Sequence, residues 1–121
     1  MNTLEETKCA LTLGQKLLSL AADQSQWSQK TFGGDAARGP LGPLKHLAKE
    51  VLETQVAFTE GNPDEIQSEF ADLLILLLDS SRRAGISIVE LVDAARDKMV
   101  ENKLREWPAA QGNDEPVEHI R

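Results

Sequence analysis

Two pairs of acidic residues have a spacing that suits metal ligands. Glu50 and Glu53 are three residues apart, and Glu69 and Asp72 repeat this spacing further along the chain. Residues three apart share a face of an α-helix, so each pair presents two carboxylates side by side. Carboxylate oxygens suit hard cations such as Mg²⁺ or Mn²⁺, and Mg²⁺ is usually shared with the phosphates of a substrate. Four converging acids would therefore bind a divalent ion together with a phosphorylated substrate.

Asp72 is the most unusual of the four acids. In the segment Glu69–Arg83, EFADLLILLLDSSRR, it interrupts an apolar run, so we expect it to be buried and to need a partner. The spacing alone is weak evidence, because a chain with 20 acidic residues contains such pairs by chance and an exposed pair is usually a solvated face. Asp79 and Arg83 lie further along the same stripe and are candidates for orienting the metal ligands.

The elements that must position these acids are helices, because four segments repeat apolar residues every three or four positions and none alternates like a strand. We expect helices from Leu4 to about Trp27–Phe32, over Leu44–Phe58, over Asp64–Ala84, and from an N-cap at Ser87 to Glu106. A tight turn at Gly61 and Asn62 makes the second and third helices antiparallel neighbours, which brings the acid pairs together. The fold class is therefore an all-α bundle of four to five helices, followed after Pro108 by an extended arm or a short turn.

The third helix is apolar on almost every side. In a chain of 121 residues such a helix is buried most easily when a second subunit covers it, so we expect a homo-oligomer. The alternative is the central helix of a monomer.

Length and composition set further bounds. The chain of 121 residues has the size of one domain, 1–121, and its single cysteine, Cys9, excludes an internal disulfide framework. The N-terminus does not look like an export signal, and the longest apolar run, Leu73–Leu78, is far shorter than the roughly 20 residues that cross a bilayer. These features predict a cytoplasmic protein. A net charge of −7 disfavours general binding to nucleic acid or anionic membranes.

The last predicted helix carries groups of the opposite sign. Lys98, Asn102 and Arg105 share one face, and their donors are suited to the phosphate oxygens that a metal leaves free. The alternative is an ordinary solvated helix end, where basic residues are favoured by the helix dipole.

Aromatic residues are only 4% of the chain, so each one is informative. Trp27 and Phe32 flank the start of a glycine-rich loop and could stack on a nucleobase, although they could equally cap the core. We expect Trp107 to belong to the core.

The chain resembles a known family at these positions. Glu50-x-x-Glu53, Glu69-x-x-Asp72 and Lys98-x-x-x-Asn102 resemble the metal motif of the all-α nucleoside triphosphate pyrophosphohydrolases, the MazG-like superfamily. The blocks WSQKTFG, GPLGPLKHLAKEVLE, EFADLLILLLDSSRRAGIS, KMVENKLREWP and PVEHIR resemble its dATP/dGTP diphosphohydrolase branch, found in bacteria and phages. One phage group of that branch, MazZ, serves genomes in which 2-aminoadenine replaces adenine.

This resemblance implies a fold, an activity and a set of site residues. It implies a MazG-like bundle, assembled as a dimer or tetramer, that hydrolyses dGTP or dATP to the monophosphate and pyrophosphate through attack of a metal-activated water on the α-phosphorus. It implies that two or three Mg²⁺ or Mn²⁺ ions bind to the four acids. Glu50, which would orient or deprotonate the water, and Glu53 are the catalytic candidates. The resemblance also implies that the phosphates and the sugar are bound by Lys98, Asn102 and Arg105. The base and the ribose would be bound by Trp27 and Phe32.

Two alternatives to this function stay open. The first is another specificity within the superfamily, such as dUTP, dCTP or damaged nucleotides. The second is a non-catalytic helical interaction module whose acids form a solvated face. Neither polymeric nucleic acid nor a membrane is an expected partner.

Overall fold

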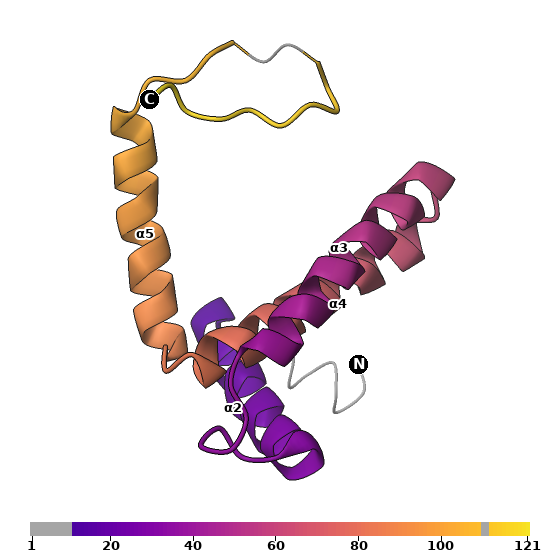
Figure 1. Ribbon diagram of the computed structural model, residues 1–121, viewed down its shortest axis with the longest axis vertical. Coiled ribbons are helices and arrows are strands. Elements are labelled where there is room, and N and C mark those ends of the chain that lie inside the picture. Colours follow the sequence, from indigo (N-terminus) through magenta and orange to yellow (C-terminus); the bar gives the residue numbers. More distant parts are fainter. Residues whose placement is uncertain (1–10, 110–111) are drawn as a thin grey trace. The chain divides into compact units, whose positions relative to one another are not determined.

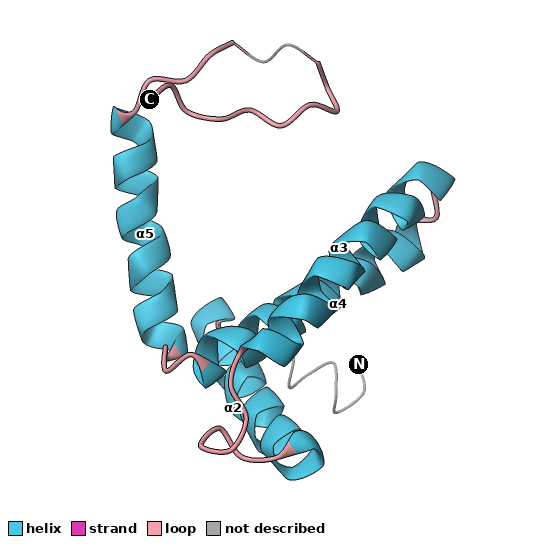
Figure 2. Cartoon of the chain, in the orientation of Figure 1, coloured by secondary structure: helices cyan, strands magenta, loops and turns pink. Residues whose placement is uncertain are grey.

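The computed structural model describes residues 11–109 and 112–121 and contains only helices, turns and loops over these ranges. The helices are α2 (Leu13–Phe32), α3 (Leu41–Glu60), α4 (Pro63–Arg83) and α5 (Ile88–Leu104) (Figures 1 and 2). The predicted all-α class is therefore confirmed. None of these helices combines the length and the apolar character that a membrane span requires.

The chain divides into two compact units, residues 1–88 and 89–121. In the first unit, α4 packs along α3 and also contacts α2 (Figure 1). The second unit contains nearly all of α5 and the tail. All contacts between the predicted acids are therefore made within the first unit.

The start of α2 differs from the prediction. Thr12 is extended, its Oγ1 accepts a hydrogen bond from Gln15 N at 3.1 Å, and its own N–H donates to Gln15 Oε1 at 2.9 Å. This reciprocal capping box begins a helix at Leu13, so the predicted helix running unbroken through Thr12 is wrong. The part of that prediction from Leu4 to residue 10 lies outside the described residues.

The turn between α3 and α4 forms where it was predicted. Gly61 has a φ of 75°, and its N–H donates to the carbonyls of Ala57 and Phe58. Glycine adopts this left-handed conformation without steric cost. Asn62 Oδ1 then accepts from Glu65 N at 3.2 Å and caps α4. This short connection makes α3 and α4 antiparallel neighbours.

The other helix ends shift by one to three residues. Helix α3 begins at Leu41 instead of Leu44, because Pro43 lies in its first turn and proline is tolerated there. Helix α5 begins directly after Ser87, as predicted, but ends at Leu104 instead of Glu106.

Helix α4 is less buried than the sequence predicts. Asp72 is exposed in the single chain, and so are Phe70, Leu74 and Leu77, at 58%, 41% and 42%. The helix is not surrounded, because α2 and α3 cover only part of its circumference. The buried carboxylate is instead Asp79, which is 7% exposed.

Asp79 lies at the centre of a polar network between α2 and α4. Its Oδ1 accepts hydrogen bonds from Gln24 Nε2 at 3.0 Å, Ser28 Oγ at 2.6 Å and Arg82 Nη2 at 2.7 Å. Arg83 Nε lies 3.4 Å from both carboxylate oxygens. A buried carboxylate is tolerated when it is paired and hydrogen-bonded in this way.

The two arginines extend this network to the loop between α2 and α3. The side chain of Arg83 is fully buried and donates to Ser28 Oγ at 2.9 Å, to the Gly33 carbonyl at 3.0 Å and to the Arg38 carbonyl at 3.2 Å. Arg82 Nε donates to Asp35 Oδ2 at 3.0 Å, and its Nη1 donates to Gln24 Oε1. The network therefore fixes both α2 and the loop that follows it to the end of α4.

The second unit folds its tail back onto the end of α5. Trp107 Nε1 donates to the Asn102 carbonyl at 2.6 Å, and its ring meets that of His119 edge to face at a centroid distance of 5.7 Å. Ile120 N donates to the Glu106 carbonyl at 2.7 Å, so the tail returns toward the helix (Figure 1). Trp107 is 42% exposed and packs on this tail, so its assignment to the core is wrong.

The Asp79 network leads to a stability prediction. Replacing Asp79 with alanine leaves two arginines without their shared acceptor, so unfolding should become easier by about 3–5 kcal/mol, the usual cost of breaking a buried ion pair. Urea unfolding followed by circular dichroism measures this. Asp64→Ala, which removes an exposed aspartate at the start of α4, should cost far less.

The same carboxylate should make stability depend on pH. Burial alone would raise the pKa of Asp79, but its hydrogen bonds from Gln24, Ser28 and Arg82 and the charge of Arg83 outweigh burial and lower the pKa to about 2. Because the folded pKa lies below the ordinary value of 3.8, this contribution is complete above about pH 4 and is lost as the pH falls toward 2. An unchanged urea midpoint for Asp79→Ala at neutral pH would contradict this role.

Candidate active site

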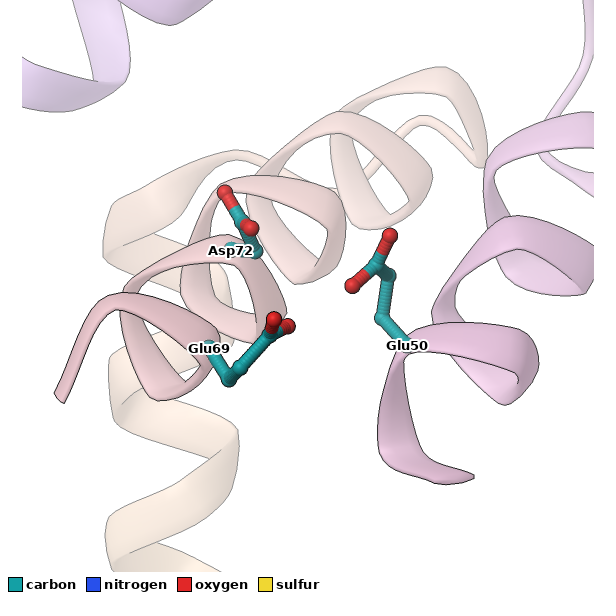
Figure 3. A group of neighbouring side chains, drawn as sticks. All are labelled: Glu50, Glu69 and Asp72. Carbon is teal, nitrogen blue, oxygen red and sulfur yellow. The ribbon is translucent and has the colours of Figure 1, made fainter. Parts of the chain in front are cut away.

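Three of the four predicted acids lie together between α3 and α4. One carboxylate oxygen each from Glu50, Glu69 and Asp72 lies within 4.8 Å of the others. Figure 3 shows Glu50 extending from α3 toward α4, and Glu69 extending from α4 toward α3. Ligand oxygens lie about 2.0–2.6 Å from Mg²⁺ or Ca²⁺, so oxygens on opposite sides of one ion are roughly 4–5 Å apart. The spacing of the three acids is in this range.

Unsatisfied carboxylate oxygens also fit a cation. Glu50 Oε2 and Glu69 Oε2 are shielded from solvent, and neither accepts a hydrogen bond from the described residues. The other Glu50 oxygen lies 3.2 Å from His46 Nε2. Buried acceptors without donors are costly, and a divalent cation would satisfy both oxygens at once. Acids with no thiolate ligand suit Mg²⁺ or Mn²⁺.

Glu53 lies beside this group of acids. Its side chain is exposed, and it lines a hollow that Glu69 also lines. It is near enough to Glu50 to influence the pKa of that carboxyl. The structure thus groups Glu50, Glu69 and Asp72 tightly and leaves Glu53 at their edge.

Repulsion among the acids appears in their pKa values. Close approach to Glu50 is the largest cause that raises the pKa of Glu69, followed by burial and by the charges of Glu53 and Asp72. Burial would also raise the pKa of Glu50, but its interactions with Glu69, Glu53 and His46 outweigh burial and lower it. The ionised pair is therefore an unfavourable arrangement that a cation would relieve.

A cavity of about 400 Å³ adjoins the acids. Helices α3 and α4 contribute Glu50, Asp72 and His46, and α2 contributes Trp27 and Phe32. The remaining lining residues are Leu20, Asp23, Gln24, Ile75, Leu76 and Asp79. Its volume lies within the usual range for sites that bind small molecules and cofactors, about 300–1,000 Å³.

The two predicted stacking residues form an aromatic wall of this cavity. The rings of Trp27 and Phe32 meet edge to face with centroids 5.3 Å apart, and the Arg38 guanidinium lies 5.5 Å from the centre of the Phe32 ring. Trp27 is 55% exposed and Phe32 49%, so neither is enclosed in a core. Edge-to-face packing fixes the orientation of both rings.

The predicted phosphate-binding residues belong to the second unit. Lys98 Nζ pairs with Glu101 Oε2 at 3.1 Å, and Arg105 Nη1 donates to Asn102 Oδ1 at 3.1 Å. These contacts are made along α5 and just beyond its end. Their action on phosphates stays a prediction.

The sequence predicts that Asp79 and Arg83 orient the metal ligands, but their contacts run to α2 and to the loop after it. This prediction missed their partners Gln24, Ser28 and Asp35. A signal was present, because Gln24 and Ser28 are polar residues one turn apart that share a face of α2.

The sequence matches a family model and a phage protein. A sequence model of the family described as dATP/dGTP pyrophosphohydrolase matches residues 20–121. The Eaa protein of Salmonella phage P22 is 42% identical over 99 residues, which cover 82% of this chain and 28% of that protein. The chain thus spans less than a third of the length of this curated relative.

A solved structure has a similar fold. It is the MazG-like pyrophosphohydrolase of cyanophage S-2L, bound to dGDP and three catalytic Mn²⁺ ions per active site. The TM-score is 0.62 at 25% sequence identity, with 86% of this chain and 92% of that chain covered.

Charge coupling between the acids leads to a testable prediction. The Glu50 carboxyl raises the pKa of Glu69 through close contact and through its charge. Because Glu50→Gln removes this carboxyl, the pKa of Glu69 should fall toward its ordinary value. Carboxyl-carbon NMR titration in the presence of a chelator measures this. An unchanged Glu69 titration would contradict the close approach of the two side chains, and Glu60→Gln is the matched control.

Proposed function

We propose, since the chain belongs to the dATP/dGTP pyrophosphohydrolase family, that it hydrolyses dGTP or dATP to the deoxynucleoside monophosphate and pyrophosphate. The observation that carries this proposal is the group formed by Glu50, Glu69 and Asp72, with two buried, unsatisfied oxygens, at the edge of a cavity of about 400 Å³. A solvated acidic face would instead leave these oxygens open to water. The reaction belongs to purine nucleotide metabolism in the cytoplasm of a bacterium or of a phage-infected cell.

The acids are proposed to hold two or three divalent ions, Mg²⁺ or Mn²⁺. Glu50, Glu69 and Asp72 supply grouped oxygens, and Glu53 adds a ligand from the edge of the group. When bound, such ions neutralise phosphate charge and lower the pKa of water to give a nucleophile. Net negative charge on the chain makes this neutralisation necessary for a triphosphate to enter.

The chain's own residues bind and orient the substrate. Glu50, held by His46, is placed to orient the attacking water and to accept its proton, with Glu53 beside it. Trp27 and Phe32 form the wall against which the base and ribose pack. Lys98, Asn102 and Arg105 provide donors for the phosphates and sugar.

Removing a proposed ligand should weaken metal binding and activity together. In Glu53→Ala and Asp72→Ala, Mn²⁺ affinity measured by calorimetry and pyrophosphate release from dGTP should each fall by at least the roughly 10- to 100-fold seen for residues that support metal sites. Asp64→Ala, which removes an exposed acid outside the cavity, should keep both.

Unchanged Mn²⁺ binding and pyrophosphate release in both variants would contradict the enzyme proposal. Absence of turnover with every common NTP and dNTP would favour a non-catalytic helical module. If the best substrate is instead dUTP, dCTP or a damaged nucleotide, the chain is a pyrophosphohydrolase of another specificity.

We also propose that the chain forms a dimer or tetramer through α4. Phe70, Leu74 and Leu77 recur at intervals of four and three, share a face of the helix and are 58%, 41% and 42% exposed. Soluble monomers rarely expose a contiguous apolar surface without a partner.

Sedimentation equilibrium tests this assembly. The wild-type chain should sediment at two or four times its 13.3 kDa mass, and Leu74→Glu should shift it toward the monomer, because a charge would be buried in the interface. Leu13→Glu, at a site that is 81% exposed, should leave the mass unchanged. A wild-type monomer at tens of micromolar would contradict the proposal.

A further inference from the structure

Asp23 lines the cavity and has no assigned role. It lies on α2 on the same side as Trp27, and both residues line the space next to Glu50 and Asp72. Among the described residues, no hydrogen bond or ion pair occupies the Asp23 carboxylate. A carboxylate without a protein partner at the wall of a ligand cavity is available to the ligand.

The other polar groups on the α2 side of the cavity are already engaged. Gln24 uses Nε2 to donate to Asp79 and Oε1 to accept from Arg82. Asp79 is held by Gln24, Ser28 and Arg82. Among the described α2 residues that line this cavity, Asp23 is therefore the one whose hydrogen-bond acceptors are left to contact a base.

The position of Asp23 relative to Trp27 suits a stacked purine. The two residues are four apart on α2, so they share a face and are separated by about 6 Å along the helix axis. A purine packed on the exposed Trp27 ring would extend one edge along the helix toward Asp23. Aromatic stacking accepts either purine, so an edge contact must provide any discrimination.

We propose that Asp23 binds the Watson–Crick edge of guanine and thereby selects dGTP over dATP. Guanine presents two adjacent donors on this edge, N1–H and the 2-amino group, and an ionised carboxylate accepts both through its two oxygens. Adenine presents the 6-amino donor beside N1, an acceptor whose lone pair opposes the carboxylate. This inference rests on the proposed function, because it assigns the base to the Trp27 side of the cavity.

Asp23→Asn provides the sharpest test, because asparagine keeps the shape of the side chain and replaces one acceptor with a donor. Asparagine opposes the 2-amino group of guanine with its own amide donor, while it matches adenine by accepting from the 6-amino group and donating to N1. The ratio of kcat/KM for dGTP to kcat/KM for dATP should therefore fall by about 10- to 100-fold, the range that corresponds to losing a hydrogen bond to a charged group. Asp64→Asn should leave the ratio unchanged.

An unchanged ratio of the two kcat/KM values in Asp23→Asn would overturn the assignment. If both values also fall by the same factor, Asp23 has only a structural role.

Equilibrium binding of dGMP and dAMP, measured by calorimetry with Mn²⁺ present, separates this inference from the proposed function. If the wild-type chain hydrolyses neither triphosphate, the proposed activity fails, yet tighter binding of dGMP that is lost in Asp23→Asn would still support the base contact. Equal binding of dGMP and dAMP by the wild-type chain would overturn the base contact even if both triphosphates are hydrolysed.

Discussion

The buried Asp79 carboxylate is the interaction on which the candidate site depends. Its Oδ1 accepts hydrogen bonds from Gln24 and Ser28 of α2 and from Arg82 of α4, and the enclosed Arg83 adds contacts to two loop carbonyls. Helix α2 carries Trp27, so this network decides whether the aromatic wall faces the acids. A charged group in this network is stabilised only when its partner is in place. The network therefore favours a single arrangement of α2, the loop after it and α4.

The acids at the other side of the cavity show the opposite energetics. Glu50 and Glu69 repel each other, and each has a shielded oxygen that accepts no hydrogen bond from the described residues, so a cation bound between them would relieve an unfavourable arrangement. Natural proteins break local rules of stability mainly at functional sites, where a ligand compensates. One helix, α4, therefore carries a satisfied carboxylate at Asp79 and, nearly three turns before it, an unsatisfied carboxylate oxygen at Glu69.

Local patterns predicted much of this arrangement, and long-range contacts account for what they missed. Helical periodicity and the Gly61–Asn62 turn gave the antiparallel pair and hence the approach of Glu50 to Glu69. Periodicity does not reveal which side of α4 the other helices cover. The sequence therefore predicts burial for Asp72, whereas in the structure Asp79 is buried and Asp72 is exposed. The Thr12–Gln15 capping box was readable as a Thr-x-x-Gln motif but was overlooked. The contacts of Arg83 with loop carbonyls have no sequence signature, because a carbonyl is present at every residue.

The central claim is that acids grouped between α3 and α4 direct cleavage at the α-phosphorus of a purine deoxynucleoside triphosphate. Hydrolysis of dGTP in oxygen-18 water with Mn²⁺, followed by mass spectrometry of the products, tests it most directly. The account predicts one oxygen-18 atom in dGMP and unlabelled pyrophosphate, both dependent on Asp72. Release of orthophosphate with dGDP, or label appearing in pyrophosphate, would contradict it.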